Sequence, residues 1–243
     1  MPTAFQIEKR KGEPMTYVMS DLHGEYELYL AMLEKINLTD DDVLYILGDV
    51  MDRGDGGFKI LFDVEERDNV ILLAGNHDMT AHFILSRLDR PLARADIEEY
   101  LYAWLADGGK ATLESYKALS REDRAYALDI LDGMLNYCEI EVGGKEYLLV
   151  HAGLEGYEEG KPLEEYPLES FIFYRQDYSK PIFRGNRYLV TGHTPTAAIE
   201  GAEPGRIYKK NNYVDVDCGA TYGLSLGCLC LDTMEEFYLP GKI

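Results

Sequence analysis

The stretch that decides the fold is Gly48-Asp49-Val50-Met51-Asp52-Arg53-Gly54, which directly follows the apolar run Val43-Leu44-Tyr45-Ile46-Leu47. The apolar run predicts a buried strand, and the glycines predict a tight turn at its carboxyl end. A turn that only reversed the chain would not need two carboxylates and a guanidinium. This density of charge suits a site that holds cations and an anion together, and Asp49 is the candidate for a carboxylate that joins two metal ions.

The same arrangement recurs along the chain, because four other predicted strands also end in metal-binding or acid–base residues. The strands are expected at residues 17–19, 43–47, 70–74, 146–150 and 187–190, and they are followed by Asp21 and His23, by Asp49, Asp52 and Arg53, by Asn76 and His77, by His151, and by His193. Four of the five histidines therefore follow a strand, and the exception is His82, which falls in a predicted helix. Ligands of open α/β sheets gather at the carboxyl ends of strands, so these side chains predict a metal site at one edge of the sheet.

The donor types indicate which metals suit this site. Carboxylate, imidazole and amide donors without a thiolate favour Mn, Fe or Zn over a closed structural zinc site. The ligands suffice for two divalent ions if one carboxylate bridges them. Two ions about 3.5–4 Å apart can clamp a phosphoryl group and acidify a water, which then acts as a nucleophile near neutral pH.

The order strand, helix, strand, helix, strand over residues 17–74 predicts an α/β fold with a parallel sheet. A helical pattern from 79 to 137, with segments at 96–106 and 121–135, predicts an insertion that is either a structural layer or a substrate lid. Strands at 138–142 and 146–150 flank a Gly143-Gly144 hairpin turn, and the segments 213–217, 224–231 and 235–239 suit a closing antiparallel sheet. The acidic loop 155–169 is expected to be a solvated surface.

Composition excludes several classes of function. The net charge of -20 argues against a nucleic-acid backbone as the main partner, because such binders usually carry a basic face. No stretch approaches the length of a membrane span, and the polar N-terminus has no apolar signal region, so we expect no membrane partner and a cytoplasmic location. The four cysteines show no CxxC spacing and are expected to be buried, reduced thiols.

Taken together, the motifs resemble a known family. Asp21-x-His23-Gly24, Gly48-Asp49-x-x-Asp52-Arg53-Gly54, Gly75-Asn76-His77, His151-x-Gly153-Leu154 and Gly192-His193 resemble, in this order, the signature of the phosphoprotein phosphatase branch of the calcineurin-like metallophosphoesterases. The resemblance covers residues 17–232, and Trp104-Leu105-x-x-Gly108-Gly109 and Asp217-x-Gly219-Ala220 are similar to bacterial and phage-type members. It implies two packed mixed β-sheets flanked by helices, in one domain over residues 1–243 with a sheet core at 15–78 and 138–240.

The resemblance also implies a ligand set for two divalent metals, of which Mn is the first expectation and Fe or Zn the alternatives. Asp21 and His23 would hold one ion, Asn76, His151 and His193 the other, and Asp49 would bridge the two. His77 would protonate the leaving oxygen as general acid, and Asp52 would orient it and favour its charged form. Arg53 would grip the phosphate bidentately, a task for which Lys is a poor substitute.

A second phosphate-binding arginine is expected between His151 and His193. Arg175 fits the spacing best, with Arg184 and Arg187 as competitors. The sequence departs from the family pattern at Ser20, where Gly is usual, and at Asp78, where Glu is common. Neither change removes a ligand, but the shorter Asp78 puts the metal preference in doubt.

The reaction implied is hydrolysis of a phosphate ester by direct attack of a metal-bound hydroxide, without a phosphoenzyme. A serine/threonine protein phosphatase is the first interpretation, with a phosphorylated protein or a small phosphoester as substrate. The close alternative is a nucleotide hydrolase resembling symmetrical diadenosine tetraphosphatase, which shares every catalytic motif. The acidic charge disfavours a polyphosphate, although Arg206, Lys209 and Lys210 offer a local basic patch. An inactive phosphate-binding protein is disfavoured, because both His77 and Asp52 are present.

Overall fold

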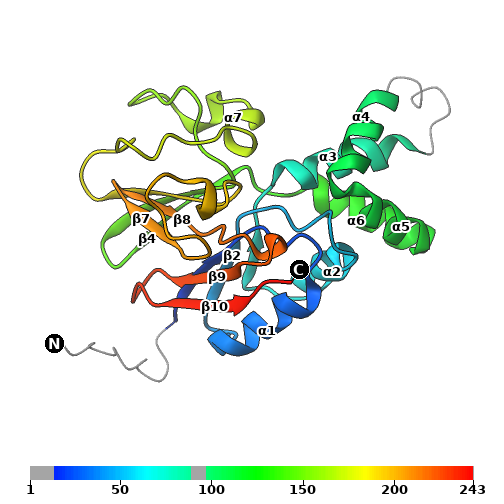
Figure 1. Cartoon of the computed structure of the whole chain (residues 1–243), viewed down its shortest axis with the longest axis horizontal. Coiled ribbons are helices and arrows are strands. Elements are labelled where there is room, and N and C mark those ends of the chain that lie inside the picture. The colour runs from blue at the N-terminus through cyan, green and yellow to red at the C-terminus, as the bar shows by residue number, and fades with distance from the viewer. Residues whose placement is uncertain (1–13, 89–96, 243) are drawn as a thin grey trace.

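The structure is a computed structural model that describes residues 14–88 and 97–242 (Figure 1). The polar N-terminus, residues 1–13, and part of the predicted insertion, residues 89–96, lie outside these residues. The described chain forms two five-stranded sheets. The first has the order β10 (Glu236–Pro240), β9 (Ser225–Cys230), β1 (Thr16–Met19), β2 (Val43–Ile46), β3 (Val70–Leu72), and the second has the order β4 (Tyr137–Val142), β5 (Lys145–Val150), β6 (Arg187–Thr191), β8 (Tyr213–Asp215), β7 (Tyr208–Lys210).

Strand directions make both sheets mixed. The predicted parallel arrangement of β1, β2 and β3 is confirmed, and β5, β6 and β8 are also parallel. The predicted closing antiparallel sheet is wrong: β9 and β10 pair as expected but join β1 in the first sheet, whereas β8 pairs in parallel with β6 in the second. The short strand β7, with sequence Tyr208-Lys209-Lys210, was not predicted, because it has no run of apolar residues.

The core lies in three layers that follow from the two-residue period of the strands. In β1, Val18 faces the second sheet and packs with Leu149 and Val190, whereas Tyr17 and Met19 face the helices on the outer side of the first sheet. The expected architecture, two mixed sheets flanked by helices, is therefore what the chain adopts. The strands that carry the predicted site residues belong to both sheets, β1, β2 and β3 to the first and β5 and β6 to the second, and residues that follow strands of both sheets line one cavity.

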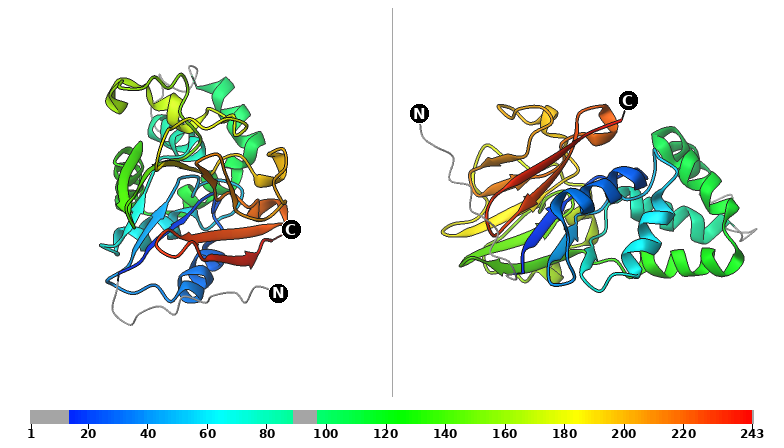
Figure 2. Two further views of the ribbon diagram at one scale, coloured as in Figure 1. Left: turned by 90° about the vertical axis from the view of Figure 1, so that its left-hand side faces the viewer. Right: turned by 90° about the horizontal axis from the view of Figure 1, so that it is seen from below.

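Helices cover the outer faces of the sheets. They are α1 (Tyr26–Ile36), α2 (Gly57–Glu65), α3 (Asn76–Leu88), α4 (Glu98–Trp104), α5 (Lys110–Ala118), α6 (Arg121–Asp132) and α7 (Leu168–Ile172). Helices α1, α2, α3 and α6 contribute to the core on the outer face of the first sheet, and Figure 2 shows α3 to α6 gathered at one end of the molecule. Helix α5 was not predicted, because Gly108-Gly109 was taken to break the helical region. A kinked turn, η1 (Leu105–Gly109), instead joins α4 directly to α5.

The acidic loop is only partly the solvated surface that was expected. Most of its glutamates are exposed, but Leu163 and Tyr166 are buried and pack with Phe171 of α7 against the outer face of the second sheet. Three of the cysteines are buried, Cys138 is half-buried, and all four are free thiols. Within the described residues, no helix combines the length and apolar character that crossing a bilayer requires.

Candidate metal centre and active site

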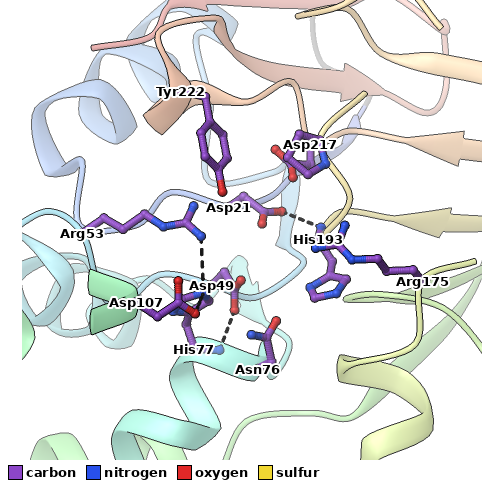
Figure 3. A pocket seen from close by; sticks show the side chains of 11 residues that line it. Asp21, Asp49, Arg53, Asn76, His77, Asp107, Arg175, His193, Asp217 and Tyr222 are labelled. Atoms are coloured by element: carbon purple, nitrogen blue, oxygen red, sulfur yellow. Dashed lines mark hydrogen bonds and ion pairs between the residues drawn. The ribbon is translucent and has the colours of Figure 1, made fainter. Parts of the chain in front are cut away.

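The predicted site residues come together around a cavity of about 170 Å³ (Figure 3). Nine of them follow the ends of β1, β2, β3, β5 and β6, and Arg175 follows α7. The cavity is lined by Asp21, Asp49, Arg53, Asn76, His77, Asp107, Arg175, His193, Pro195, Asp217 and Tyr222. The other three predicted residues, His23, Asp52 and His151, are buried and each contacts a residue of the lining.

Backbone strain is concentrated at this site. Ten described non-glycine residues have a positive φ, and six of them are Asp21, His23, Asp49, Asp52, Arg53 and His193, with φ between 45° and 68°. Each costs about 1–3 kcal/mol and persists only where surrounding contacts enforce it, as is common at functional sites. The strands therefore end in turns whose geometry is set by the positions of these side chains.

Asp78 enforces the geometry of the turn after β2. Its two carboxylate oxygens accept hydrogen bonds from four backbone N–H groups, those of Asp49 at 2.7 Å, Val50 and Met51 at 3.0 Å, and Gly75 at 3.0 Å. The residue is fully buried at the start of α3. The shorter side chain at this position thus holds the backbone that presents Asp49, rather than approaching a metal position itself.

Two histidines are each held through Nδ1, so that Nε2 faces Asp49. His23 Nδ1 lies 2.9 Å from the carbonyl oxygen of Met51, and His151 Nδ1 lies 2.6 Å from that of Leu47. A carbonyl only accepts, so both Nδ1 atoms carry a proton, and Nε2 is the ring atom that each histidine directs at Asp49. These Nε2 atoms lie 3.8 Å and 3.3 Å from Asp49 Oδ2, which is the arrangement of imidazole ligands on two sides of one carboxylate.

The remaining donors complete two clusters. One comprises His23, Asp49 and His77, and the other comprises Asp49, His151 and His193, so that Asp49 belongs to both. Asn76 Oδ1 lies 3.0 Å from His151 Nε2, and Asp21 Oδ2 accepts from the backbone N–H of His193 at 2.9 Å. Ser20 Oγ lies 2.5 Å from the same Asp21 oxygen and orients that carboxylate.

The buried carboxylates of the two clusters favour positive charge near them. Burial opposes a charge on His151, yet the nearby carboxylates of Asp49 and Asp21 raise its pKa to about 10. Burial lowers the pKa of His23 to about 4 and raises that of Asp21. Buried carboxylates that hold a proton on a buried imidazole would be compensated equally well by cations, which would replace that proton. The two clusters are therefore consistent with a dinuclear metal site.

His77 is held differently from the other histidines. Its Nδ1 lies 2.8 Å from Asp52 Oδ2, and its Nε2 faces the cavity, 3.4 Å from Arg53 Nη2 and 3.8 Å from Asp107 Oδ2. Burial lowers the pKa of His77, but the hydrogen bond and charge of Asp52, together with Asp49, raise it overall. The ring thus carries a proton more readily than an ordinary histidine.

The helical insertion fixes Asp52 and Arg53 in place. Trp104 Nε1 donates to Asp52 Oδ2 at 2.8 Å, and Thr112 Oγ1 donates to Asp52 Oδ1 at 2.7 Å. The backbone N–H of Arg53 donates to the carbonyl oxygen of Gly108 at 3.0 Å. The insertion thus supports the turn after β2 and adds Asp107 to the cavity lining.

Two arginines reach the cavity from opposite sides (Figure 3). Arg53 Nη1 donates to Thr221 Oγ1 at 3.1 Å, and its guanidinium lies 5.1 Å from the ring centre of Tyr222. Arg175 is exposed and its Nη1 donates to Thr194 Oγ1 at 3.4 Å. Of the competitors for this position, Arg187 pairs with Glu139, and neither it nor Arg184 lines the cavity.

Comparison with known proteins identifies the family. A family model described as calcineurin-like phosphoesterase matches residues 15–217, which include every predicted site residue. The chain is a calcineurin-like phosphoesterase. With the two clusters described above, this makes it a metal-dependent phosphoesterase.

The individual proteins that resemble this phosphoesterase have different described activities. The symmetrical bis(5'-nucleosyl)-tetraphosphatase of Salmonella paratyphi B is 32% identical over 100 residues, which cover 37% of this chain and only 36% of the Salmonella protein. A crystal structure described provisionally as a diadenosine tetraphosphatase has a TM-score of 0.66 at 13% identity and covers 96% of both chains. A serine/threonine phosphatase of Saccharomyces cerevisiae has a TM-score of 0.58 at 13% identity, covering 96% of this chain and 81% of its own. At such identities the two structures show the fold alone.

Several residues that line or support the site of this phosphoesterase were not predicted from the sequence. Trp104 was noted for its motif, but not as a donor to Asp52, and Thr112 carried no signal at all. Asp107 and Tyr222 lie in a turn after α4 and in the short helical turn η4 (Ala220–Tyr222), where no strand end marks them. Only the spacing of Trp104 to Gly109 could have directed attention to this part of the cavity.

Proposed function

We propose that this phosphoesterase hydrolyses a phosphoanhydride of a dinucleoside polyphosphate, with symmetrical diadenosine tetraphosphate as the substrate to test. The observation that carries the choice of substrate is the 32% identity to the symmetrical bis(5'-nucleosyl)-tetraphosphatase over 100 residues. The sequence analysis ranked a serine/threonine protein phosphatase first. The sequence relatives support the nucleotide hydrolase better, so we reverse that order.

The metal ligands in this proposal divide between two positions on either side of Asp49. Asp21 and His23 would hold one ion and Asn76, His151 and His193 the other, and Asp49, which belongs to both clusters, would contribute to each. We propose Mn as the native metal, with Fe or Zn as alternatives, because the donors are oxygen and imidazole nitrogen. Bound here, two such ions supply charge stabilisation to the phosphoryl oxygens and lower the pKa of water.

The protein's own groups then act on the substrate from opposite sides. Arg53 and Arg175 bind the nonbridging oxygens of the reacting phosphate, and the planar fork of each guanidinium suits two oxygens at once. His77 Nε2 donates its proton to the leaving oxygen, while Asp52 holds Nδ1 and favours the protonated ring.

A protein phosphatase remains the second candidate, and one observation favours it. The net charge of -20 repels a tetraphosphate at long range but does not repel a phosphorylated peptide carrying basic residues. A substrate comparison decides between the two. Purified protein loaded with Mn²⁺ is assayed with diadenosine tetraphosphate, a phosphoserine peptide and a phosphotyrosine peptide. We expect kcat/KM to be at least a hundredfold higher for the dinucleotide, and a preference for the phosphoserine peptide would restore the first interpretation.

A further inference from the structure

A second and larger cavity adjoins the metal centre. It has a volume of about 580 Å³, and Arg175 lines both cavities. Sites for small molecules usually measure about 300–1,000 Å³, so the cavity of about 170 Å³ at the metal centre is too small for more than the reacting phosphate. The rest of a nucleotide substrate must lie outside it. The larger cavity, here called the outer cavity, lies directly across Arg175.

The position of the general acid tells which part of a substrate would enter the outer cavity. His77, Arg53 and Asp107 lie on one side of the metal centre, whereas Arg175 and His193 lie on the other (Figure 3). The leaving oxygen must point toward His77 to receive its proton. The attacking water approaches phosphorus opposite the leaving oxygen, so a substituent that stays on phosphorus is equatorial, like the nonbridging oxygens that Arg175 binds. Arg175 also lines the outer cavity, which is therefore within reach of that substituent.

We propose that the outer cavity binds the retained nucleoside half of the substrate, an inference that rests on the proposed nucleotide hydrolysis. A phosphate monoester has a single organic substituent, which leaves on the side of His77 and makes no use of such a cavity. An internal phosphorus of a dinucleoside polyphosphate carries a second substituent, which stays on phosphorus when the leaving oxygen departs toward His77. The outer cavity thus selects a substrate with two halves over a monoester.

The lining of the outer cavity has the chemistry of a nucleoside site. Tyr208 and Ile199 are buried and offer an apolar surface to a purine ring. Tyr178 packs edge-on against Tyr208, with ring centres 5.7 Å apart. Lys210 lies exposed in β7 and places an ammonium within the lining, where it attracts a second phosphate next to the one that reacts. The carboxylate of Glu200 can accept hydrogen bonds from sugar hydroxyls.

The reaction balances with water as the only co-reactant. The water oxygen forms a bond to one of the two central phosphorus atoms, and the bond from that phosphorus to the bridging oxygen breaks. The bridging oxygen takes the proton from His77, and the water releases a proton to solvent. Two molecules of ADP result, one leaving on the side of His77 and one retained in the outer cavity.

A pair of chromogenic substrates isolates the retained half. 4-Nitrophenyl phosphate and the 4-nitrophenyl ester of the β-phosphate of adenosine 5'-diphosphate share a leaving group and differ by the retained nucleoside and its phosphate. Assayed with the full chain loaded with Mn²⁺, the nucleoside ester should have a KM at least tenfold lower. Ala198→Trp places an indole in the outer cavity and should reduce this selectivity by tenfold or more, and Lys210→Ala should reduce it about threefold.

The chain offers a matched control for each variant. Ala197 is exposed like its neighbour Ala198, and Lys209 precedes Lys210 but pairs with Glu236, and neither Ala197 nor Lys209 lines the outer cavity. Ala197→Trp and Lys209→Ala should therefore keep the selectivity of the unaltered protein.

Three results would overturn the proposal: equal KM values for the two esters, equal effects of the two tryptophan variants, or a loss confined to phosphoserine peptide turnover in Ala198→Trp. Diadenosine tetraphosphate is assayed separately. Its hydrolysis without a preference for the nucleoside ester rejects the outer cavity alone, and the reverse result rejects the proposed substrate alone.

Discussion

Replacing Asp52 by Asn tests the proton donor without changing the shape of the site. The side chain is fully buried, and Oδ2 accepts from both His77 and Trp104 while Oδ1 accepts from Thr112. An amide oxygen can still accept from the two rings, and the amide nitrogen can donate to the threonine hydroxyl. Asp52→Asn therefore removes the charge, keeps an acceptor for both rings and reverses the hydrogen bond with Thr112.

The lost charge sets the size of the effect. A hydrogen bond to a charged group contributes about 1.5–3 kcal/mol, and about 1.36 kcal/mol corresponds to one pKa unit. We therefore expect the pKa of His77 to fall by about 1–2 units in Asp52→Asn. The protonated fraction at alkaline pH, and with it the rate on substrates that need a proton, falls by about 10–100-fold.

The assay is the pH dependence of kcat/KM for two aryl phosphates. Phenyl phosphate has a poor leaving group and should show a basic limb shifted to lower pH by about 1–2 units, whereas 2,4-dinitrophenyl phosphate needs no proton and should change little. Asp107→Asn is the control, because it removes a charge 3.8 Å from the other ring nitrogen where the side chain is 70% exposed and screened by water. An unshifted limb, or an equal loss on both substrates, would refute the role given to His77.

Three further outcomes follow from the same contacts. Asp52 raises the pKa of His77 in the folded protein. The ion pair therefore contributes fully to the free energy of unfolding below the unfolded-state pKa of histidine, about 6.5, and this contribution is lost as the pH rises through the folded-state pKa. In urea unfolding, Asp52→Asn should reduce the free energy of unfolding less at pH 9 than at pH 6. Gly109→Ala would push a Cβ into the indole of Trp104 and should cost about 1–3 kcal/mol, measured as a lower urea midpoint. Arg53→Lys should raise KM about tenfold with unchanged metal content, because a point charge replaces a bidentate fork.

The sequence could predict the site better than the fold around it. Apolar runs mark the strands, and parallel strands of one sheet present their carboxyl ends at one edge, so Asp21, Asp49 and Asn76 could be placed together. His193 follows a strand of the second sheet, and the packing of the two sheets brings it to Asp21. The histidines and aspartates at those strand ends are residue types that bind metals, so they indicate a metal site without further structural information. The structure does bring all ten predicted residues to one cavity and its immediate surroundings.

What the sequence could not predict depends on long-range packing. The pairing of β9 with β1 joins segments about two hundred residues apart, and no local pattern specifies it. The bond from Trp104 to Asp52 spans 52 residues and requires the insertion to fold back on the turn after β2. Leu163 and Tyr166 are buried although they lie in a glutamate-rich segment of the sequence, and the charge of that segment predicted an exposed loop instead.

The central claim is that two divalent ions, joined by Asp49, perform the hydrolysis. It is tested most directly by titrating metal-free protein with Mn²⁺ while following 4-nitrophenyl phosphate hydrolysis and the bound metal by elemental analysis. We predict that activity rises until two ions are bound per chain, and that Asp49→Asn neither binds two ions nor regains activity. Full activity with one bound ion, or two ions retained in Asp49→Asn, would contradict the account.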